Sequence, residues 1–136
     1  MRWETYMISR IDHIVLTVKN IETTLDFYKR VLKMEEVTFQ ETRKALKFGN
    51  QKINLHLQGS EIPPVAASPG PGTQDICFVT DVPIDALLRH LKSEGVEILQ
   101  GPVQRTGAMG PMTSVYFFDP DENLIEVSNY PHGGSL

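Results

Sequence analysis

The sequence of 136 residues contains a single cysteine, Cys77, so the chain cannot form a disulfide bond within itself. It has no apolar run close to the roughly 20 residues that a membrane-spanning helix needs. The first ten residues, MRWETYMISR, include Glu4 and have no apolar core segment, so they do not resemble a secretory signal peptide. These absences favour a cytoplasmic protein with no membrane partner.

Positive charge is not in excess either. The 13 Lys and Arg residues are outnumbered by 17 Asp and Glu residues, which gives a formal net charge of −4. Because nucleic-acid-binding domains usually carry a basic patch or stripe, this balance argues against a nucleic-acid partner. Hydrophobic residues make up 40% of the chain, an ordinary share for a globular protein. The length and composition predict one domain with a sizeable core.

The first half of the chain predicts a strand, a helix and three further strands. Residues 11–18 (IDHIVLTV) are mostly β-branched or apolar, as in a buried strand. Asn20 is a suitable cap for the following helix. The apolar residues of that helix recur on one face, at Ile21, Leu25, Tyr28 and Leu32. Short strand-like segments follow at 35–42, 44–49 and 52–58.

The second half repeats this order after a linker. Residues 59–73 contain four prolines and three glycines and show no periodicity, which is typical of a connector. A strand is predicted at 75–80, and then a helix that begins near Pro83. Further strands are predicted at 96–105, 113–118 and 124–129, with a loop at 106–112 and a turn at 119–123 (DPDEN).

The order β-α-β-β-β therefore occurs twice. We predict an α+β fold in which two βαβββ modules, about 11–58 and 74–130, form an incomplete eight-stranded barrel-like cup. Residues 59–73 are the linker between the modules. Residues 1–10 are an N-terminal extension of this single domain, and residues 131–136 are its tail.

Laying one half over the other picks out four polar residues. Matching IDHIVLTV with TQDICFVT pairs His13 with Asp75, and matching FGNQKINLHL with FDPDENLIEV pairs His56 with Glu126. A polar group in an apolar strand costs free energy unless it is paired or coordinated. Two imidazoles and two carboxylates in one cup would suit a divalent first-row metal such as Zn, Ni, Mn or Fe(II).

Two segments make a family resemblance specific. DHIVLTVKNIETTLDFYKRVL and FFDPDENLIEV are similar to the opening and closing signatures of the vicinal oxygen chelate superfamily, which includes glyoxalases, bleomycin-resistance proteins and dioxygenases. The similarity runs from Ile11 to about Tyr130 and is greatest to the subgroup of glyoxalase domain-containing protein 5. It implies a metal site at four positions, His13, His56, Asp75 and Glu126.

The glyoxalase pattern has His, Glu, His and Glu at these positions, so the sequence departs from it at His56 and Asp75. The resemblance then implies His13, His56 and Glu126 as the first ligands, with Asp75 as a weaker fourth ligand or a partner of the ligands. It also implies a homodimer and a small-molecule substrate, and no organic cofactor is indicated. Each of these four residues could equally be an ordinary strand residue that is hydrogen-bonded or solvated.

The activity implied by the resemblance is a metal-dependent lyase or isomerase reaction in which Glu126 moves a proton next to a metal-bound oxygen. Two alternatives stay open: a metal-free protein that sequesters small molecules, as bleomycin-resistance proteins do, and an Fe(II) extradiol-type dioxygenase. Arg105, Met109 and Met112 flank the predicted 106–112 loop, which would be either a lid or an ordinary surface loop. Cys77, in an apolar strand with no basic neighbour, is expected to be an inert buried thiol.

Overall fold

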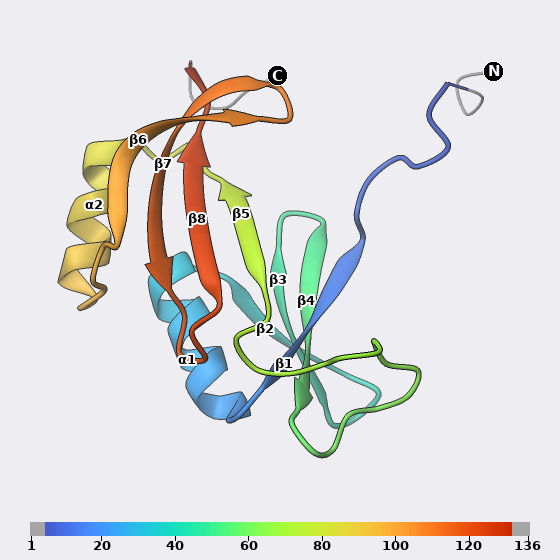
Figure 1. Cartoon of the computed structure of the whole chain (residues 1–136). Coiled ribbons are helices and arrows are strands. Elements are labelled where there is room, and N and C mark those ends of the chain that lie inside the picture. The colour runs from blue at the N-terminus through green and yellow to red at the C-terminus, as the bar shows by residue number, and fades with distance from the viewer. Residues whose placement is uncertain (1–4, 132–136) are drawn as a thin grey trace.

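A computed structural model describes residues 5–131. Residues 1–4 of the predicted extension and residues 132–136 of the predicted tail lie outside this range. Two helices and eight strands follow one another in the predicted order (Figure 1). The elements of the first module are β1 (His13–Val18), α1 (Ile21–Leu32), β2 (Glu35–Phe39), β3 (Arg43–Phe48) and β4 (Gln51–Leu57). Those of the second are β5 (Asp75–Val79), α2 (Ile84–Ser93), β6 (Gln100–Gly107), β7 (Gly110–Phe118) and β8 (Leu124–Asn129).

Each module forms its own four-stranded sheet. The strand orders are β1-β4-β3-β2 and β5-β8-β7-β6, so the two sheets have the same topology. In each of them the first strand pairs in parallel with the last, and the other pairs are antiparallel. The predicted α+β fold of two βαβββ modules is confirmed. Strands β1 and β5 are sheet edges, so each has backbone groups that no strand of its own sheet pairs.

The helices begin and end where local chemistry favours it. The side-chain Oδ1 of Asn20 accepts a hydrogen bond from the backbone N–H of Thr23 at 2.9 Å, which caps α1 as predicted. Lys33, just after α1, has a φ of 57°, a left-handed conformation typical of a helix end. Pro83 precedes α2, where its missing N–H costs little.

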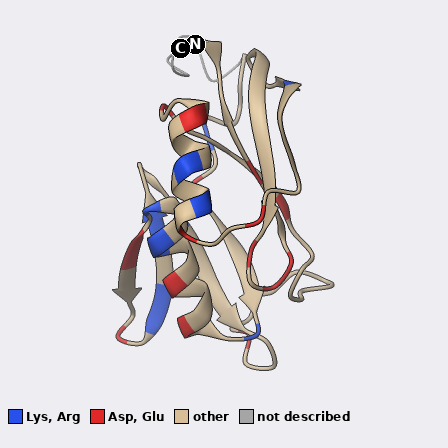
Figure 2. Cartoon of the chain, turned by 90° about the vertical axis from the view of Figure 1, so that its left-hand side faces the viewer, with Lys and Arg blue, Asp and Glu red and all other residues tan. Residues whose placement is uncertain are grey.

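One core lies between the helices and one face of each sheet. Alternate residues of a strand point to opposite faces, and the inward set is apolar in both sheets. This core contains Leu16, Val18, Leu46, Ile53, Val115, Phe117, Ile125 and Val127 from the sheets, with Leu25, Tyr28, Val31, Leu87 and Leu91 from the helices. The solvent side of the helices carries charges of both signs (Figure 2). Arg30 of α1 pairs there with Glu94 after α2, at 2.9 Å.

The opposite faces of the sheets, which we call the first and second open faces, therefore point away from this shared core. The strand registers assign residues to them by alternation. The first open face carries His13, Val15, Thr17, Glu35, Val37, Phe39, Arg43, Ala45, Lys47, Lys52, Asn54 and His56. The second carries Asp75, Cys77, Val79, Arg105, Ser114, Tyr116, Glu126 and Ser128. All four predicted metal ligands lie on these faces.

The predicted 106–112 loop is wrong. Strands β6 and β7 continue through it, with Gly107 paired to Gly110 and Arg105 to Met112, so the segment is a hairpin rather than a lid. Met112 is buried. Gly110 has a φ of 123°, a conformation that glycine adopts without steric cost, and the sequence signal of the two glycines was therefore a tight turn.

The turn at 119–123 is confirmed, and Asp119 organises it. Its carboxylate is 5% exposed and accepts hydrogen bonds from the backbone N–H groups of Asp121 and Asn123, both at 2.9 Å. It also accepts from the Asn123 side-chain amide at 2.9 Å and from the Tyr28 hydroxyl of α1 at 2.6 Å. Burial and the Asp119 charge raise the pKa of Tyr28. The turn thus anchors the second module to the helix of the first.

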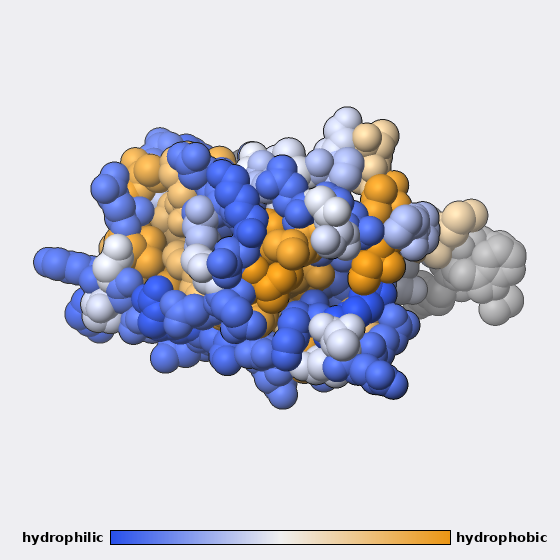
Figure 3. All heavy atoms as spheres, turned by 90° about the horizontal axis from the view of Figure 1, so that it is seen from below, coloured by the Kyte–Doolittle hydropathy of each residue, from blue (hydrophilic) through white to orange (hydrophobic). Residues whose placement is uncertain are grey.

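Among residues 5–131, no helix is long and apolar enough to cross a membrane. Apolar side chains are nevertheless exposed at the sheet edges, at Val15 of β1 and Val79 of β5. Seen from below, the mostly hydrophilic surface is broken by apolar patches (Figure 3). Exposed apolar side chains at a free sheet edge are typical of a surface that contacts another chain.

Candidate functional site

His13 opens β1 on the first open face, and its side chain is 44% exposed. Its Nδ1 lies 2.8 Å from the Asp12 carboxylate, which lowers the pKa of Asp12. Because a carboxylate only accepts, Nδ1 carries a proton, and Nε2 is the nitrogen that a neutral ring offers to a ligand. A carboxylate behind a histidine is the usual support of a metal-binding or proton-accepting imidazole. Asp12 was missed from the sequence, although it directly precedes His13.

His56 lies on the same face but has a different environment. Its Nε2 is 3.3 Å from Nη2 of Arg43 on the neighbouring strand β3, and the residue is buried at 6% exposure. A guanidinium only donates, so Nε2 accepts, and the imidazole is neutral. Burial and the Arg43 charge lower the pKa of His56. A nitrogen that faces a guanidinium is a poor ligand for a metal cation, so this contact disfavours the predicted metal role of His56.

This contact gives a prediction. We expect the pKa of His56, followed by NMR, to lie below the ordinary histidine value of about 6.5. Replacing Arg43 by Gln should raise it, because the opposing charge is removed. The matched variant Arg89→Gln, on the outer side of α2, should leave it unchanged. A His56 pKa at or above the ordinary value in the parent protein would contradict the arrangement.

The strand registers change which residues of the two halves correspond. Val15 lies opposite Asn54, as Cys77 lies opposite Glu126 in the second module. Thr17 lies opposite His56, as Val79 lies opposite Ser128. The register counterpart of Glu126 is therefore Asn54, not His56 as the sequence overlay has it. The overlay missed this because Asn54 and His56 alternate on one strand, and both fit a polar position.

Glu126 is half-buried in the middle of the second open face. Cys77 of β5 and Tyr116 of β7 are its register partners. Ser128 donates to its Oε2 at 3.3 Å. Tyr116 in turn accepts a hydrogen bond from Nε of Arg105 at 2.9 Å. Burial raises the pKa of Tyr116, and Glu126 raises it further, so this hydroxyl stays protonated near neutral pH. A carboxylate and a hydroxyl donor thus lie side by side.

Asp75 and Cys77 share the edge strand β5 with exposed side chains. The expectation that Cys77 is buried was wrong because β5 is a sheet edge. Its thiol lies 3.3 Å from the Ser128 hydroxyl. Partial burial raises the pKa of Cys77, and the nearby carboxylates of Glu126 and Asp75 raise it further. Because the thiolate is disfavoured, Cys77 is a poor candidate for a catalytic nucleophile, although its exposed side chain stays accessible to thiol reagents.

The predicted ligands do not meet within one chain. His13 and His56 lie on the first open face and Asp75 and Glu126 on the second, and both faces point away from the common core. In residues 5–131, no three His, Cys, Asp or Glu side chains gather closely enough to hold a metal ion. His13 and Glu126 have the donor chemistry that a divalent ion requires, but one chain does not supply a complete set.

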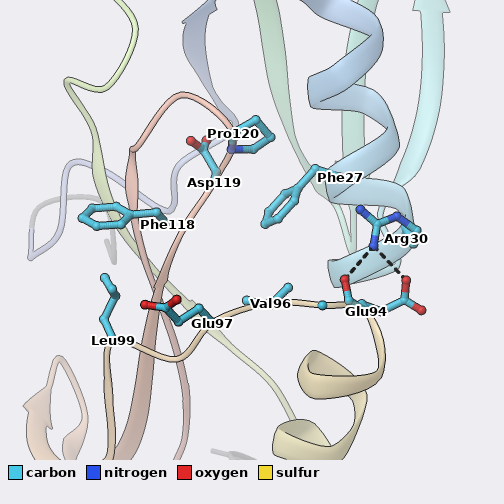
Figure 4. Close-up of a pocket in the computed structure, with 10 residues that line it drawn as sticks. Phe27, Arg30, Glu94, Val96, Glu97, Leu99, Phe118, Asp119 and Pro120 are labelled. Atoms are coloured by element: carbon cyan, nitrogen blue, oxygen red, sulfur yellow. Dashed lines mark hydrogen bonds and ion pairs between the residues drawn. The ribbon is translucent and has the colours of Figure 1, made fainter.

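Two hollows lie near these elements, besides a larger one of about 600 Å³ between the end of α1 and Cys77 and Val79 of β5. One, of about 430 Å³, lies between the first open face, with His13, Thr17 and His56, and linker residues 64–70. Another, of about 440 Å³, lies between α1 and the segment after α2 (Figure 4). In the second hollow Arg30 is already paired with Glu94, and Asp119 is held by the turn. The first hollow is therefore the better candidate for a ligand.

Known proteins are similar to this chain in sequence and fold. Residues 10–127 match the model of the Glyoxalase/Bleomycin resistance protein/Dioxygenase superfamily. The chain is 52% identical over 124 residues to virulence protein STM3117 of Salmonella typhimurium, covering 91% of this chain and 86% of that protein. The crystal structure of STM3117 superimposes with a TM-score of 0.89 at 53% identity, over 90% of this chain and 98% of that one.

Two further relatives come from other organisms. Glyoxalase domain-containing protein RDO1 of Mycosarcoma maydis is 50% identical over 123 residues, which cover 90% of this chain and 69% of that protein. Metallothiol transferase FosB of Shouchella clausii is 28% identical over 131 residues, covering 96% and 84%. The narrower resemblance to glyoxalase domain-containing protein 5 stays a prediction. The chain belongs to the Glyoxalase/Bleomycin resistance protein/Dioxygenase superfamily.

Proposed function

We propose that this protein is a small-molecule enzyme of the glyoxalase type, with a site between the first open face of one subunit and the second open face of another. The observation that carries this proposal is the free Nε2 of His13, which Asp12 orients on an exposed strand end. An imidazole nitrogen that is oriented and exposed in this way can bind a metal ion or a proton. The other reactive group, Glu126, lies on the second open face, which does not face His13 within one chain.

A second copy supplies what one chain lacks. Strands β1 and β5 are the edges of sheets with the same topology, and Val15 and Val79 are exposed on them. Setting β1 of one copy beside β5 of the other would cover both edges and turn the two open faces toward a common cup. This arrangement is the predicted eight-stranded cup in intermolecular form, and it makes the proposed enzyme a homodimer.

In that cup, His13 of one copy would face Glu126 and Asp75 of the partner subunit. These three side chains would hold a divalent ion, which supplies Lewis-acid polarisation of a substrate oxygen when bound. The relative FosB is named a metallothiol transferase, which supports metal use in this family branch. Glu126, next to the Tyr116 hydroxyl, would move a proton at the neighbouring carbon, as in lyase and isomerase chemistry.

A metal-free protein that sequesters small molecules is the second candidate. The contact between His56 and Arg43 favours it, because it places positive charge where the glyoxalase-type prediction has a metal ligand. Asn54, the counterpart of Glu126, is an amide and binds cations more weakly than a carboxylate. Metal content separates the two candidates.

Metal binding is therefore the test. We expect the purified protein to bind about one Mn²⁺, Ni²⁺ or Zn²⁺ per subunit by calorimetry and elemental analysis, and His13→Ala and Glu126→Ala to abolish binding. Asp12→Asn should weaken it by roughly 10–100-fold, because the support of the imidazole is lost. Glu22→Gln, an exposed variant on α1, is the control. Absence of binding by the parent protein would leave only the sequestering function.

A further inference from the structure

Two cations of the first open face share one aromatic ring. Nζ of Lys52 lies 3.8 Å from the centroid of the Phe39 ring, and Cζ of Arg43 lies 4.8 Å from it. Nη2 of Arg43 also reaches Nε2 of the neutral His56 at 3.3 Å. We call Phe39, Arg43, Lys52 and His56 the basic cluster.

The strand registers explain how the cluster forms. Phe39 of β2 lies opposite Arg43 of β3, and the Arg43 side chain in turn contacts His56 of β4. Lys52 lies four residues before His56 on β4, so its side chain reaches diagonally across β3 to the Phe39 ring. The residue of β3 between them is Ala45, which is small and fully buried.

Neither charge of the cluster forms an ion pair within the described part of the chain, although Asp12 lies close enough to Lys52 for that charge to lower the pKa of Asp12. Over residues 5–131, Arg10, Arg30 and Arg89 each lie within 4.0 Å of a carboxylate, whereas Arg43 and Lys52 do not. The other polar contact of the Arg43 side chain is to the neutral Gln40. Its Nε is buried and has no acceptor. Two like charges on one ring repel each other, and a buried N–H without an acceptor costs free energy.

An anion would remove both costs. We propose that the basic cluster binds the anionic group of the ligand, a carboxylate, phosphate or phosphonate. A guanidinium presents a planar fork of N–H donors that matches two oxygens of such a group, and Lys52 adds a second positive charge. The aromatic ring holds both cations in place without neutralising them. The chain as a whole is acidic, so this basic site is local rather than a result of net charge.

The position of the cluster relates it to the candidate site. Lys52 is the register partner of His13, and His56 lines the hollow that His13 also lines. An anionic group held at Arg43 and Lys52 would leave the rest of the ligand beside His13. As a statement about the substrate, this inference rests on the proposed function, but binding of an anion to the first open face requires neither metal nor catalysis.

The test is binding of inorganic phosphate, methylphosphonate and acetate to the metal-free full chain, in a chelating buffer with chloride at matched ionic strength. Titrations are followed by calorimetry and by the NMR signal of the Arg43 Nε–H. We expect saturable binding of at least one anion with a shift of that signal. Arg43→Gln should weaken binding about tenfold or more, since a hydrogen bond to a charged group is lost. Arg43→Lys and Lys52→Gln should weaken it less, and the control Arg89→Gln not at all.

Two results would overturn the inference: no saturable binding of any of the three anions, or equal affinity in the parent protein, Arg43→Gln and Lys52→Gln. Circular dichroism checks that each variant folds. If Arg43→Gln does not fold, the anion affinity of Lys52→Gln is the deciding measurement. Failure of the proposed function would appear separately, as absence of metal binding while anions still bind. The preferred anion identifies the chemical class of the ligand.

Discussion

Replacing Asp119 by alanine is expected to lower the free energy of unfolding by about 3–5 kcal/mol, because several buried hydrogen bonds to a charged group, each worth about 1.5–3 kcal/mol, are lost together. The carboxylate accepts four hydrogen bonds from the turn and from Tyr28. Without it, the Tyr28 hydroxyl and the backbone N–H groups of the turn would be buried without partners. Since domains are stable by only about 5–15 kcal/mol, this one change removes much of the total.

Urea denaturation followed by circular dichroism measures this loss. Asp81→Ala, an exposed aspartate after β5, is the matched control and should change the free energy of unfolding by less than about 0.5 kcal/mol. Tyr28→Phe should cost less than Asp119→Ala, because three of the four hydrogen bonds remain. A loss below about 1 kcal/mol in Asp119→Ala would show that the turn does not anchor the second module to α1.

The fold could be predicted from sequence because its signals are local and occur twice. The apolar face of α1, its cap at Asn20 and the prolines of the linker each depend on neighbours in the chain. The hairpin at 106–112 was the main error. Glycines that mark a tight turn between two strands were interpreted as a loop, since periodicity alone does not separate a short hairpin from an irregular segment.

The candidate site was less predictable, because the chemical role of each of its residues depends on contacts between strands. Sequence alternation put His56 on a polar face, but the guanidinium that faces its Nε2 comes from another strand, at Arg43. Asn54 was passed over because its correspondence with Glu126 follows from strand register rather than from residue type. His13 and Glu126 both point away from the shared core. These directions follow from how the two sheets pack, and a pattern in the sequence does not predict them.

The largest effect expected at the site is on how two chains join. Val15 lies on the edge of the first open face, at the position of the first module that is equivalent to Cys77 in the second. We consider a variant with a cysteine at Val15. Both side chains are exposed on edge strands. In the proposed dimer β1 of one copy lies beside β5 of the other, so the two thiols of different copies come close. Within one chain they lie on faces that point away from each other.

Crosslinking of the Val15→Cys variant with a short-spacer bis-maleimide is therefore the most direct measurement of the shared site. The account predicts a covalent dimer as the main product on denaturing gels. Thr23→Cys on α1, the parent protein with Cys77 alone, and Val15→Cys combined with Cys77→Ser should all stay largely monomeric. A monomer in which both thiols are joined to each other, or a dimer yield no higher than in the Thr23→Cys control, would contradict a site built by two copies.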